Sequence, residues 1–283
     1  MRIKNILLPL ALCGTIAASH AQERIVSTAG NASETLALLN AADRIAAVDT
    51  TSLLPADIMA SKPKIGYRRA LSSEGILSLS PDLIILAPDA GPPEAVQQLE
   101  SVGIPLLRTQ DLKTQDGINA DIRAIAKAVQ REAEGETLIT TLDATLEKAR
   151  TVQGSYAKKP RILLYFASHN GGGQGMGKDS AGDALIALLG GDNAMEAEGM
   201  KPLGTESLLT LPADVILVAE LHKNLEKTAV PASADDLPDL AVAPAAQNGC
   251  LIRINVMESL GFGPSYADAT LAISEAIAAC LKP

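Results

Sequence analysis

Short apolar runs that predict strands recur through the first third of the chain, at 24–27, 45–48, 83–87 and 104–107. Between the first two runs, leucines at helical spacing predict a helix over 31–39. Because short strands separated by helices form parallel βα units, this pattern predicts an α/β fold.

A helical pattern then continues for more than thirty residues, from 118 to about 150, with a weak point at Gly135. The strand pattern resumes at 162–166, 215–219 and 251–256. The order of elements therefore predicts two α/β lobes joined by one long helical segment.

An internal repeat supports two similar lobes. Residues 72–87 align with 204–219, with six identities in sixteen positions, and a looser match relates 37–39 to 187–189. The first half carries about eighteen extra residues between these landmarks, a stretch that includes 62–67. Two lobes linked by a helix enclose a cleft with restricted hinge motion, which favours a ligand-binding protein.

The first 21 residues have the pattern of a secretory signal peptide. Arg2 and Lys4 precede an apolar run at 6–12, and small residues at Ser19 and Ala21 predict cleavage after Ala21. A retained anchor is disfavoured because the run is far shorter than the ~20 residues of a spanning helix. The chain then divides into a leader at 1–21, an N-terminal lobe at 22–116, a linking helical segment at 117–152 and a C-terminal lobe at 153–283.

Composition excludes some partners. The chain has 283 residues, 47% of them hydrophobic, a mean hydropathy of +0.17 and a net charge of −9, which becomes −11 without Arg2 and Lys4. An acidic chain with 2% aromatic residues lacks both the basic surface and the stacking platforms of a nucleic-acid-binding protein. We expect no nucleic-acid partner.

Two cysteines, Cys250 and Cys280, remain after removal of the leader. An even number in an oxidising compartment favours a disulfide, which would fasten the last helix to a strand. Two independent buried thiols are the alternative.

Enzymatic and metal signatures are scarce. The chain after the leader has two histidines, His169 and His222, and contains no Gly-x-Ser-x-Gly, His-Glu-x-x-His or phosphate-loop motif. Two histidines without clustered carboxylates cannot easily supply the three or four ligands that a divalent-metal site needs. The glycine-rich stretch 171–178 lacks phosphate-loop spacing and predicts a flexible loop facing the cleft.

One segment carries distinctive chemistry. Tyr67 lies on a predicted loop beside Arg68 and Arg69, directly before a helix capped by Ser72 or Ser73. A phenolate oxygen is a hard anionic ligand that suits ferric iron and is known to ligate haem. The alternative is a tyrosine that packs over the loop with its hydroxyl hydrogen-bonded.

The segment 66–75 resembles the haem-ligand segment of periplasmic haem-binding proteins of bacterial haem ABC importers, the HmuT-type class III substrate-binding proteins. The similarity continues through 177–186, 190–194, 201–203 and 260–264. It implies an α/β fold of two Rossmann-like lobes, each with a mainly parallel central sheet and flanking helices, bridged by a long helix.

The resemblance also implies roles for individual residues. Tyr67 would be the axial iron ligand, and Arg69 would hydrogen-bond the phenolate or pair with a propionate. His169 corresponds to a histidine that ligates iron in some members, in certain cases the iron of a second haem. Ser265 stands where members often carry arginine, so one propionate or docking contact is in doubt.

Glu74 and Glu206 are related by the repeat, and each falls in the first turn of a predicted helix. Stabilisation by the helix dipole is by itself a sufficient explanation for a carboxylate at either position. In similar binding proteins such a pair meets arginines of the permease, and we expect the same docking role here.

The expected function is therefore capture of haem b, as a transported ligand, and its delivery to an inner-membrane ABC permease. The protein would be a periplasmic monomer with no catalytic activity, supplied with free haem or by an outer-membrane haem receptor system. The alternatives are a siderophore or corrinoid binder of the same fold, or an exported enzyme with an unrecognised site.

Overall fold

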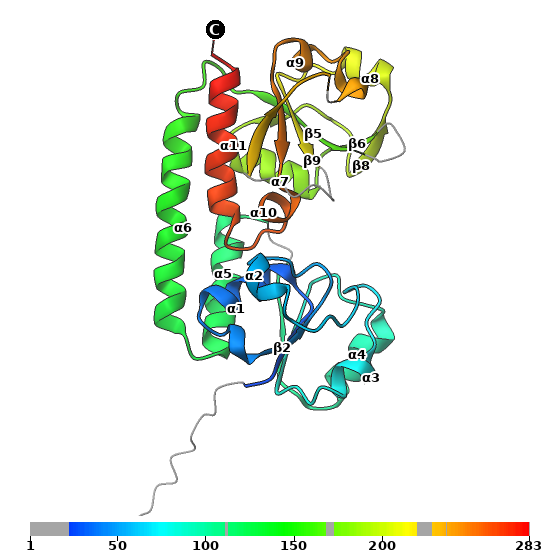
Figure 1. Cartoon of the computed structure of the whole chain (residues 1–283), viewed down its shortest axis with the longest axis vertical. Coiled ribbons are helices and arrows are strands. Elements are labelled where there is room, and N and C mark those ends of the chain that lie inside the picture. Colours follow the sequence, from blue (N-terminus) through cyan, green and yellow to red (C-terminus); the bar gives the residue numbers. More distant parts are fainter. Residues whose placement is uncertain (1–22, 111–112, 168–172, 220–227, 236, 283) are drawn as a thin grey trace, which may run out of the picture.

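The computed structural model describes residues 23–110, 113–167, 173–219, 228–235 and 237–282. They form two α/β lobes joined along one side by the long helix α6 (Glu132–Gln153), as Figure 1 shows. The expected fold class, two α/β lobes with a helical bridge, is confirmed. The predicted leader lies outside the described residues.

The N-terminal lobe is built on a four-stranded parallel sheet with strand order β2-β1-β3-β4. Its elements are β1 (Ile25–Ser27), α1 (Gly30–Leu38), a 3-10 turn (Ala42–Arg44), β2 (Ile45–Val48), α2 (Ala56–Met59), α3 (Ser73–Leu77), β3 (Leu83–Leu86), α4 (Pro93–Ser101) and β4 (Leu106–Arg108).

Helices cover both faces of this sheet, which explains why its strands are apolar throughout. Ile85 packs on the side of α1, whereas its neighbour Ile84 packs on the side of α3 and α4, as the alternation of side chains along a strand requires. All four residues of β3 are buried. A strand buried on both faces reads as a continuous hydrophobic run, and this made β3 visible in the sequence.

The C-terminal lobe has a larger, mixed sheet in the order β10-β11-β9-β5-β6-β8, with β7 paired to β5. The central strands β11, β9 and β5 are parallel, whereas β10, β6 and β8 pair antiparallel. Its elements are β5 (Arg161–Ala167), β6 (Gly173–Met176), α7 (Ala181–Leu188), β7 (Asp192–Asn193), β8 (Met200–Leu203), α8 (Thr205–Thr210), β9 (Val215–Ala219), β10 (Ala229–Ala232), a 3-10 turn (Pro238–Leu240), α9 (Pro244–Gln247), β11 (Leu251–Ile254), α10 (Val256–Leu260) and α11 (Tyr266–Cys280).

The prediction of a flexible loop at 171–178 is wrong for the part that the structure describes. Gly173–Met176 forms β6 and pairs antiparallel with both β5 and β8. Its glycines serve close packing rather than flexibility, because a Cβ at Gly173 would collide with the Tyr165 ring and one at Gly175 with the Met195 side chain.

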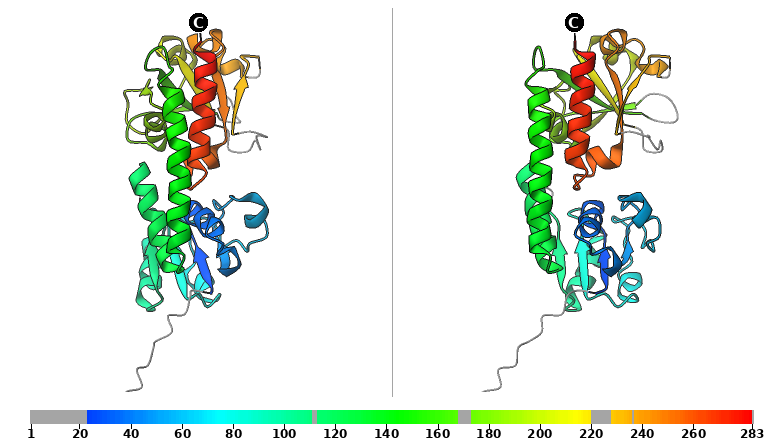
Figure 2. Two further views of the ribbon diagram at one scale, coloured as in Figure 1. Left: turned by 90° about the vertical axis from the view of Figure 1, so that its left-hand side faces the viewer. Right: turned by 60° about the vertical axis from the view of Figure 1, so that its left-hand side comes forward.

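The linking segment consists of two helices, α5 (Gln115–Ala128) and α6. The chain turns between them at Gln130, which has a φ of 57°, and not at Gly135. Gly135 lies buried inside α6, where a Cβ would collide with Ala126 of α5. Figure 2 shows α6 running beside both lobes, with α11 alongside its second half.

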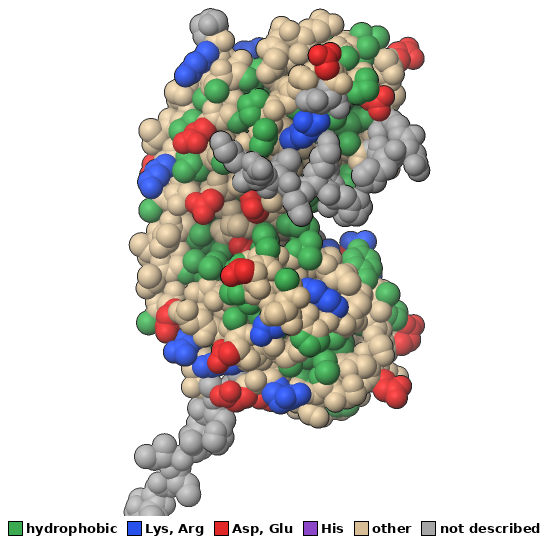
Figure 3. Space-filling model, in the orientation of Figure 1, with side chains coloured by type: hydrophobic (Ala, Val, Ile, Leu, Met, Phe, Trp, Pro, Cys, Tyr) green, Lys and Arg blue, Asp and Glu red, His purple; other side chains and the backbone are tan. Residues whose placement is uncertain are grey.

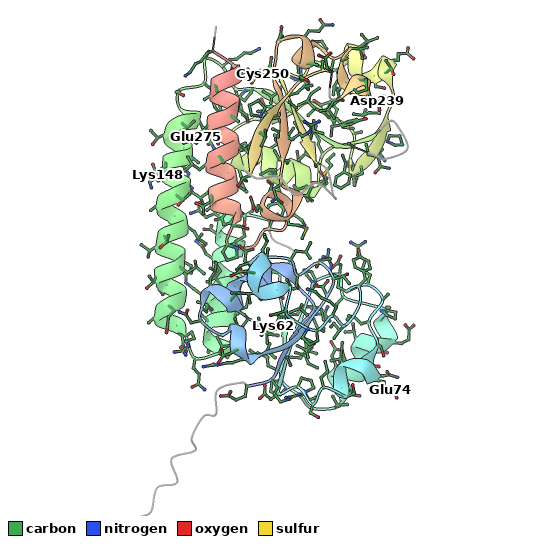
Figure 4. The ribbon with its side chains drawn as sticks, in the orientation of Figure 1. Lys62, Glu74, Lys148, Asp239, Cys250 and Glu275 are labelled. Atoms are coloured by element: carbon green, nitrogen blue, oxygen red, sulfur yellow. A yellow bond between two sulfur atoms is a disulfide. The ribbon has the colours of Figure 1, made fainter. Side chains whose placement is uncertain are left out.

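Among the described residues, no helix combines the length and apolar character that a bilayer span requires. Cys250 and Cys280 form a disulfide across 30 residues, which fastens the end of α11 to the start of β11. The favoured pairing of the two cysteines is therefore confirmed, and Figure 4 labels Cys250 beside the end of α11.

Replacing Cys250 and Cys280 by serine should destabilise the C-terminal lobe by about 3 to 4 kcal/mol, because the bridge closes a 30-residue loop in the unfolded chain. Thermal unfolding of wild type and variant by circular dichroism measures the loss. Equal melting temperatures, or two free thiols in the denatured unreduced wild type, would contradict the bridge.

Candidate functional site

A cleft of about 590 Å³ lies between the two lobes. Figure 3 shows the surface hollowed there. The N-terminal lobe lines it with the Tyr67 loop and the ends of its strands, and the C-terminal lobe with α10 and the loop that follows. Its aliphatic and aromatic lining includes Leu53, Leu54, Tyr67, Ile118, Val256, Met257, Leu260 and Phe262.

Tyr67 begins a tight turn at the edge of this cleft. The Ala70 N–H donates to the Tyr67 carbonyl (2.8 Å), and Gly66 before it has a φ of 91°, a left-handed conformation that glycine adopts without strain. Tyr67 is 44% exposed, which is unusual for an aromatic residue in a chain that has few aromatic residues. The turn therefore presents Tyr67 to the cleft instead of packing it in the core.

Asp89, in the loop after β3, binds both arginines of the turn. Its carboxylate accepts hydrogen bonds from Arg68 Nε (2.7 Å) and Nη2 (3.2 Å) and from Arg69 Nε (2.7 Å), and Arg69 Nη2 forms an ion pair with the same oxygen as Arg69 Nε, at 2.6 Å. The Arg68 guanidinium carbon lies 6.0 Å from the centroid of the Tyr67 ring. Three charged side chains thus form one ion-pair cluster around the base of Tyr67.

This cluster shifts the pKa values of Asp89 and Arg69. Burial raises the pKa of the Asp89 carboxyl, but the hydrogen bonds from Arg68 and Arg69 outweigh it, so the net pKa lies below the ordinary value. The hydrogen bond to Asp89 and its negative charge raise the pKa of Arg69. Asp89 and Arg69 are therefore both charged at neutral pH.

A buried polar network supports the cluster from beneath. Arg68 Nη1 donates to Thr51 Oγ1 (3.3 Å), and Thr51 Oγ1 donates to Asp49 (2.7 Å). Asp49 is completely buried and also accepts from the Ser52 hydroxyl (2.8 Å). Because the Asp49 carboxylate and the Thr51 hydroxyl each accept a hydrogen bond within this network, the network fixes Arg68 rather than leaving it mobile.

The lobes touch at the inner end of the cleft, where α1 meets the turn before α11. The Ser265 N–H donates to Glu34 Oε1 (2.7 Å), and Gly263 lies so close to Glu34 that a Cβ would collide with the carboxylate. A side chain at 263 would therefore force the Glu34 carboxylate to move. Ser265 is the position at which the family resemblance led us to expect an arginine. Its backbone N–H supplies a contact between the lobes.

Glu34 is only 5% exposed, and this burial raises its pKa to about 7, against the lowering effect of its hydrogen bonds from Ser265. The nearby charge of Glu258 raises it further. A second carboxyl that lines the cleft, Asp121, also has a raised pKa because of burial, partly offset by the Gln110 N–H.

The structure brings together only some of the predicted site residues. Tyr67 and Arg69 line the cleft, whereas Glu74 and Glu206 are exposed in the first turns of α3 and α8. These two helices lie on the side of their lobes away from α6 (Figure 1), and Figure 4 shows Glu74 pointing outward there. His169 lies outside the described residues.

The helix cap predicted at Ser72 or Ser73 is Ser72, whose hydroxyl accepts from the Gly75 N–H (3.1 Å). Among the side chains described, no group of three His, Cys, Asp or Glu residues is arranged to hold a metal ion. Tyr67 lines the cleft and carries a phenol oxygen, a type of ligand known to bind haem iron.

Asp89 and Glu34 were missed by sequence reasoning. Asp89 follows a parallel strand at its carboxyl end, the edge at which open α/β sheets bind ligands, so its position offered a signal. Glu34 offered none, since a glutamate within a helix is ordinarily solvent-exposed.

The fold has counterparts among known proteins. The periplasmic heme-binding protein RhuT from Roseiflexus sp. RS-1 is 32% identical, with a TM-score of 0.81 over 92% of this chain and 100% of that one. The periplasmic heme-binding protein BhuT, solved with two hemes, is 29% identical, also with a TM-score of 0.81, over 92% of this chain and 99% of that one.

Curated relatives are more distant. The vitamin B12-binding protein of Vibrio cholerae is 28% identical over 144 residues, which is 51% of this chain and 50% of that protein. The chain thus matches only about half the length of this relative.

Residues 25–255 match the family described as periplasmic binding protein, so the chain belongs to that family. The two lobes, the helical bridge and the interlobe cleft are the architecture of a substrate-binding protein, and the family is not one of enzymes. Membership implies a periplasmic location.

The buried Glu34 should make stability pH-dependent. Because its folded-state pKa of about 7 exceeds its unfolded value, its stabilising contribution is complete below about pH 4 and is lost as pH rises through 7, a change of about 3 kcal/mol by pH 8. Glu34→Gln should remove this dependence and melt above wild type at pH 8. Melting temperatures of wild type and Glu34→Gln at pH 5 and pH 8 measure the effect, and Glu94→Gln, which changes an exposed carboxyl, is the control. If wild type and Glu34→Gln differed in melting temperature by the same amount at both pH values, the prediction would be contradicted.

Proposed function

We propose that this protein captures haem b in the interlobe cleft and delivers it to an inner-membrane ABC permease. The observation that carries the proposal is the half-exposed Tyr67, held at the cleft edge by a braced turn and flanked by two arginines. The similarity to heme-binding proteins over nearly the whole chain supports the same ligand.

In this proposal Tyr67 supplies the axial oxygen ligand to the haem iron. The aliphatic side chains of both lobes, such as Leu53 and Leu260, cover the porphyrin and exclude water from it. Arg69, whose side chain is 59% exposed, provides a cation for a haem propionate. His169 is proposed as a second iron ligand from the C-terminal lobe.

A corrinoid is the second candidate ligand, because curated relatives of this chain are vitamin B12-binding proteins. The geometry favours haem over a corrinoid. An exposed phenol at the cleft edge is suited to ferric iron, whereas corrinoid capture has no required role for it.

The remaining steps concern delivery. We propose that the leader at 1–21 is cleaved after Ala21 and that the mature monomer receives free haem or haem from an outer-membrane receptor system. Glu74 and Glu206 then dock on basic residues of the permease, one from each lobe. Their carboxylates are exposed on α3 and α8 and have no hydrogen-bond or ion-pair partner among the described residues, which suits such a role.

Hemin added to the purified protein should shift the Soret band and give a high-spin, tyrosinate-type ferric spectrum. Tyr67→Phe should abolish the tyrosinate signature, because it removes only the ligand oxygen. Tyr156→Phe, which alters a half-buried hydroxyl bonded to Ser274 instead, is the matched control. A wild-type titration without a Soret change would refute haem capture, and tighter binding of cobalamin than of hemin would favour the corrinoid.

Charge reversal at both Glu74 and Glu206 to lysine should abolish haem uptake by cells while leaving hemin affinity unchanged, since neither residue lines the cleft. Reversal of Glu132 and Glu275, two exposed carboxylates on α6 and α11, is the control with the same change in net charge. Normal uptake by the Glu74 and Glu206 variant would refute the docking role.

A further inference from the structure

Glu34 joins the two lobes at the inner end of the cleft. Its carboxylate, on α1 of the first lobe, accepts the Ser265 N–H (2.7 Å) at the start of α11 in the second lobe. A Cβ at Gly263 would overlap Glu34 Oε2 and lie 3.1 Å from the Asn31 Cα, so the backbones of the two lobes pass very close to each other here. Glu34 also lines the cleft itself.

We propose that Glu34 is a positioning residue for haem capture: it sets the width of the cleft by holding the second lobe's wall at a fixed distance from the first lobe. This inference rests on the proposed function, which assigns the ligand. The role requires no contact between Glu34 and the haem iron.

The segment that Glu34 holds is continuous with the wall of the cleft. Val256, Met257, Leu260 and Phe262 line the cleft from α10 and the loop after it, and Ser265 follows three residues later. Phe262 is buried and has a φ of 49°, a left-handed conformation that is strained for an aromatic residue and persists only where its surroundings hold it. A displacement of Ser265 would therefore move this wall.

The start of α11 has no side-chain cap from its own lobe. Ser265 occupies the N-cap position without a side-chain cap hydrogen bond, and the next two backbone N–H groups donate to carbonyls of the preceding loop. The Ser265 N–H is thus left for Glu34, whose carboxylate also interacts favourably with the dipole of this 15-residue helix. Separation of the lobes would leave this N–H without its partner, which costs free energy.

A hydrogen bond fixes a distance in a way that apolar packing does not. The hydrophobic core shared by α5, α6 and α11 joins the lobes, but the hydrophobic effect is not directional. The bond from Ser265 to Glu34 weakens when its length or angle changes. The core therefore holds the lobes together, and the Glu34 contact defines their spacing at the cleft.

The first test measures the spacing of the lobes in ligand-free protein. Spin labels at Gln97→Cys on α4 and Ser207→Cys on α8, two exposed positions in different lobes, report it by double electron–electron resonance. Glu34→Ala should lengthen or broaden the distance distribution, whereas Glu34→Gln, whose amide oxygen still accepts the Ser265 N–H, should leave it unchanged. Asp121→Ala is the control, because this buried cleft carboxyl bonds the Gln110 N–H and not the second lobe.

A double-mutant cycle separates this contact from a general effect on folding. Gly263→Ala should also lengthen the label distance, because its Cβ overlaps the Glu34 carboxylate. In a Glu34→Ala background the same change should lengthen it much less, since that carboxylate is gone. Equal lengthening in both backgrounds, or a Glu34→Ala distribution identical to that of wild type, would overturn the inference.

The second test measures hemin dissociation as transfer to apomyoglobin. Glu34→Ala should accelerate dissociation about tenfold, the effect expected from loss of one hydrogen bond to a charged group, and Glu34→Gln should stay close to wild type. Faster dissociation from Glu34→Ala without a change in label distance would show direct contact with the ligand and would overturn the positioning role. A wild type that binds no hemin would instead overturn the proposed function, and the distance measurements would still decide whether Glu34 sets the spacing.

Discussion

The two lobes are held together by one shared hydrophobic core on the α6 side. Ile139, Leu142 and Leu146 of α6 pack between α5, which contacts α1 of the first lobe, and the start of α11, which belongs to the second. Burial of each such side chain stabilises the arrangement by about 2 kcal/mol. Because this core spans both lobes, they cannot separate widely, and the cleft opens only on the opposite side.

This constraint explains the character of the cleft. Its inner end is closed where Gly263 approaches Glu34, and its outer edge carries the Tyr67 turn. A carboxyl that titrates near neutral pH thus joins the lobes directly, while a charged cluster at the edge is braced by buried Asp49. Rigid helices and braced charges together favour a preformed site over one assembled by large domain closure.

The internal repeat shows how one unit serves two lobes differently. In both lobes a helix with an exposed glutamate in its first turn precedes a buried parallel strand, β3 in one and β9 in the other. Around that unit the first lobe adds the Tyr67 loop, whereas the second extends its sheet with antiparallel β6 and β8. Tyr67 and Arg69, the proposed ligand-binding residues, therefore both lie in the first lobe, whereas the two carboxylates proposed for docking come one from each lobe.

The sequence by itself determined the elements whose signals are local. Apolar runs located β2 and β9 to the residue, helical periodicity located the bridge, and the phenol beside two arginines indicated the ligand class. Only the tertiary structure decided that Asp89 holds Arg69 and that Glu34 meets Ser265, pairs separated by 20 and 231 residues. A single sequence carries the chemistry of each partner but not their distance, because contacts so far apart are set by how the sheets and helices pack.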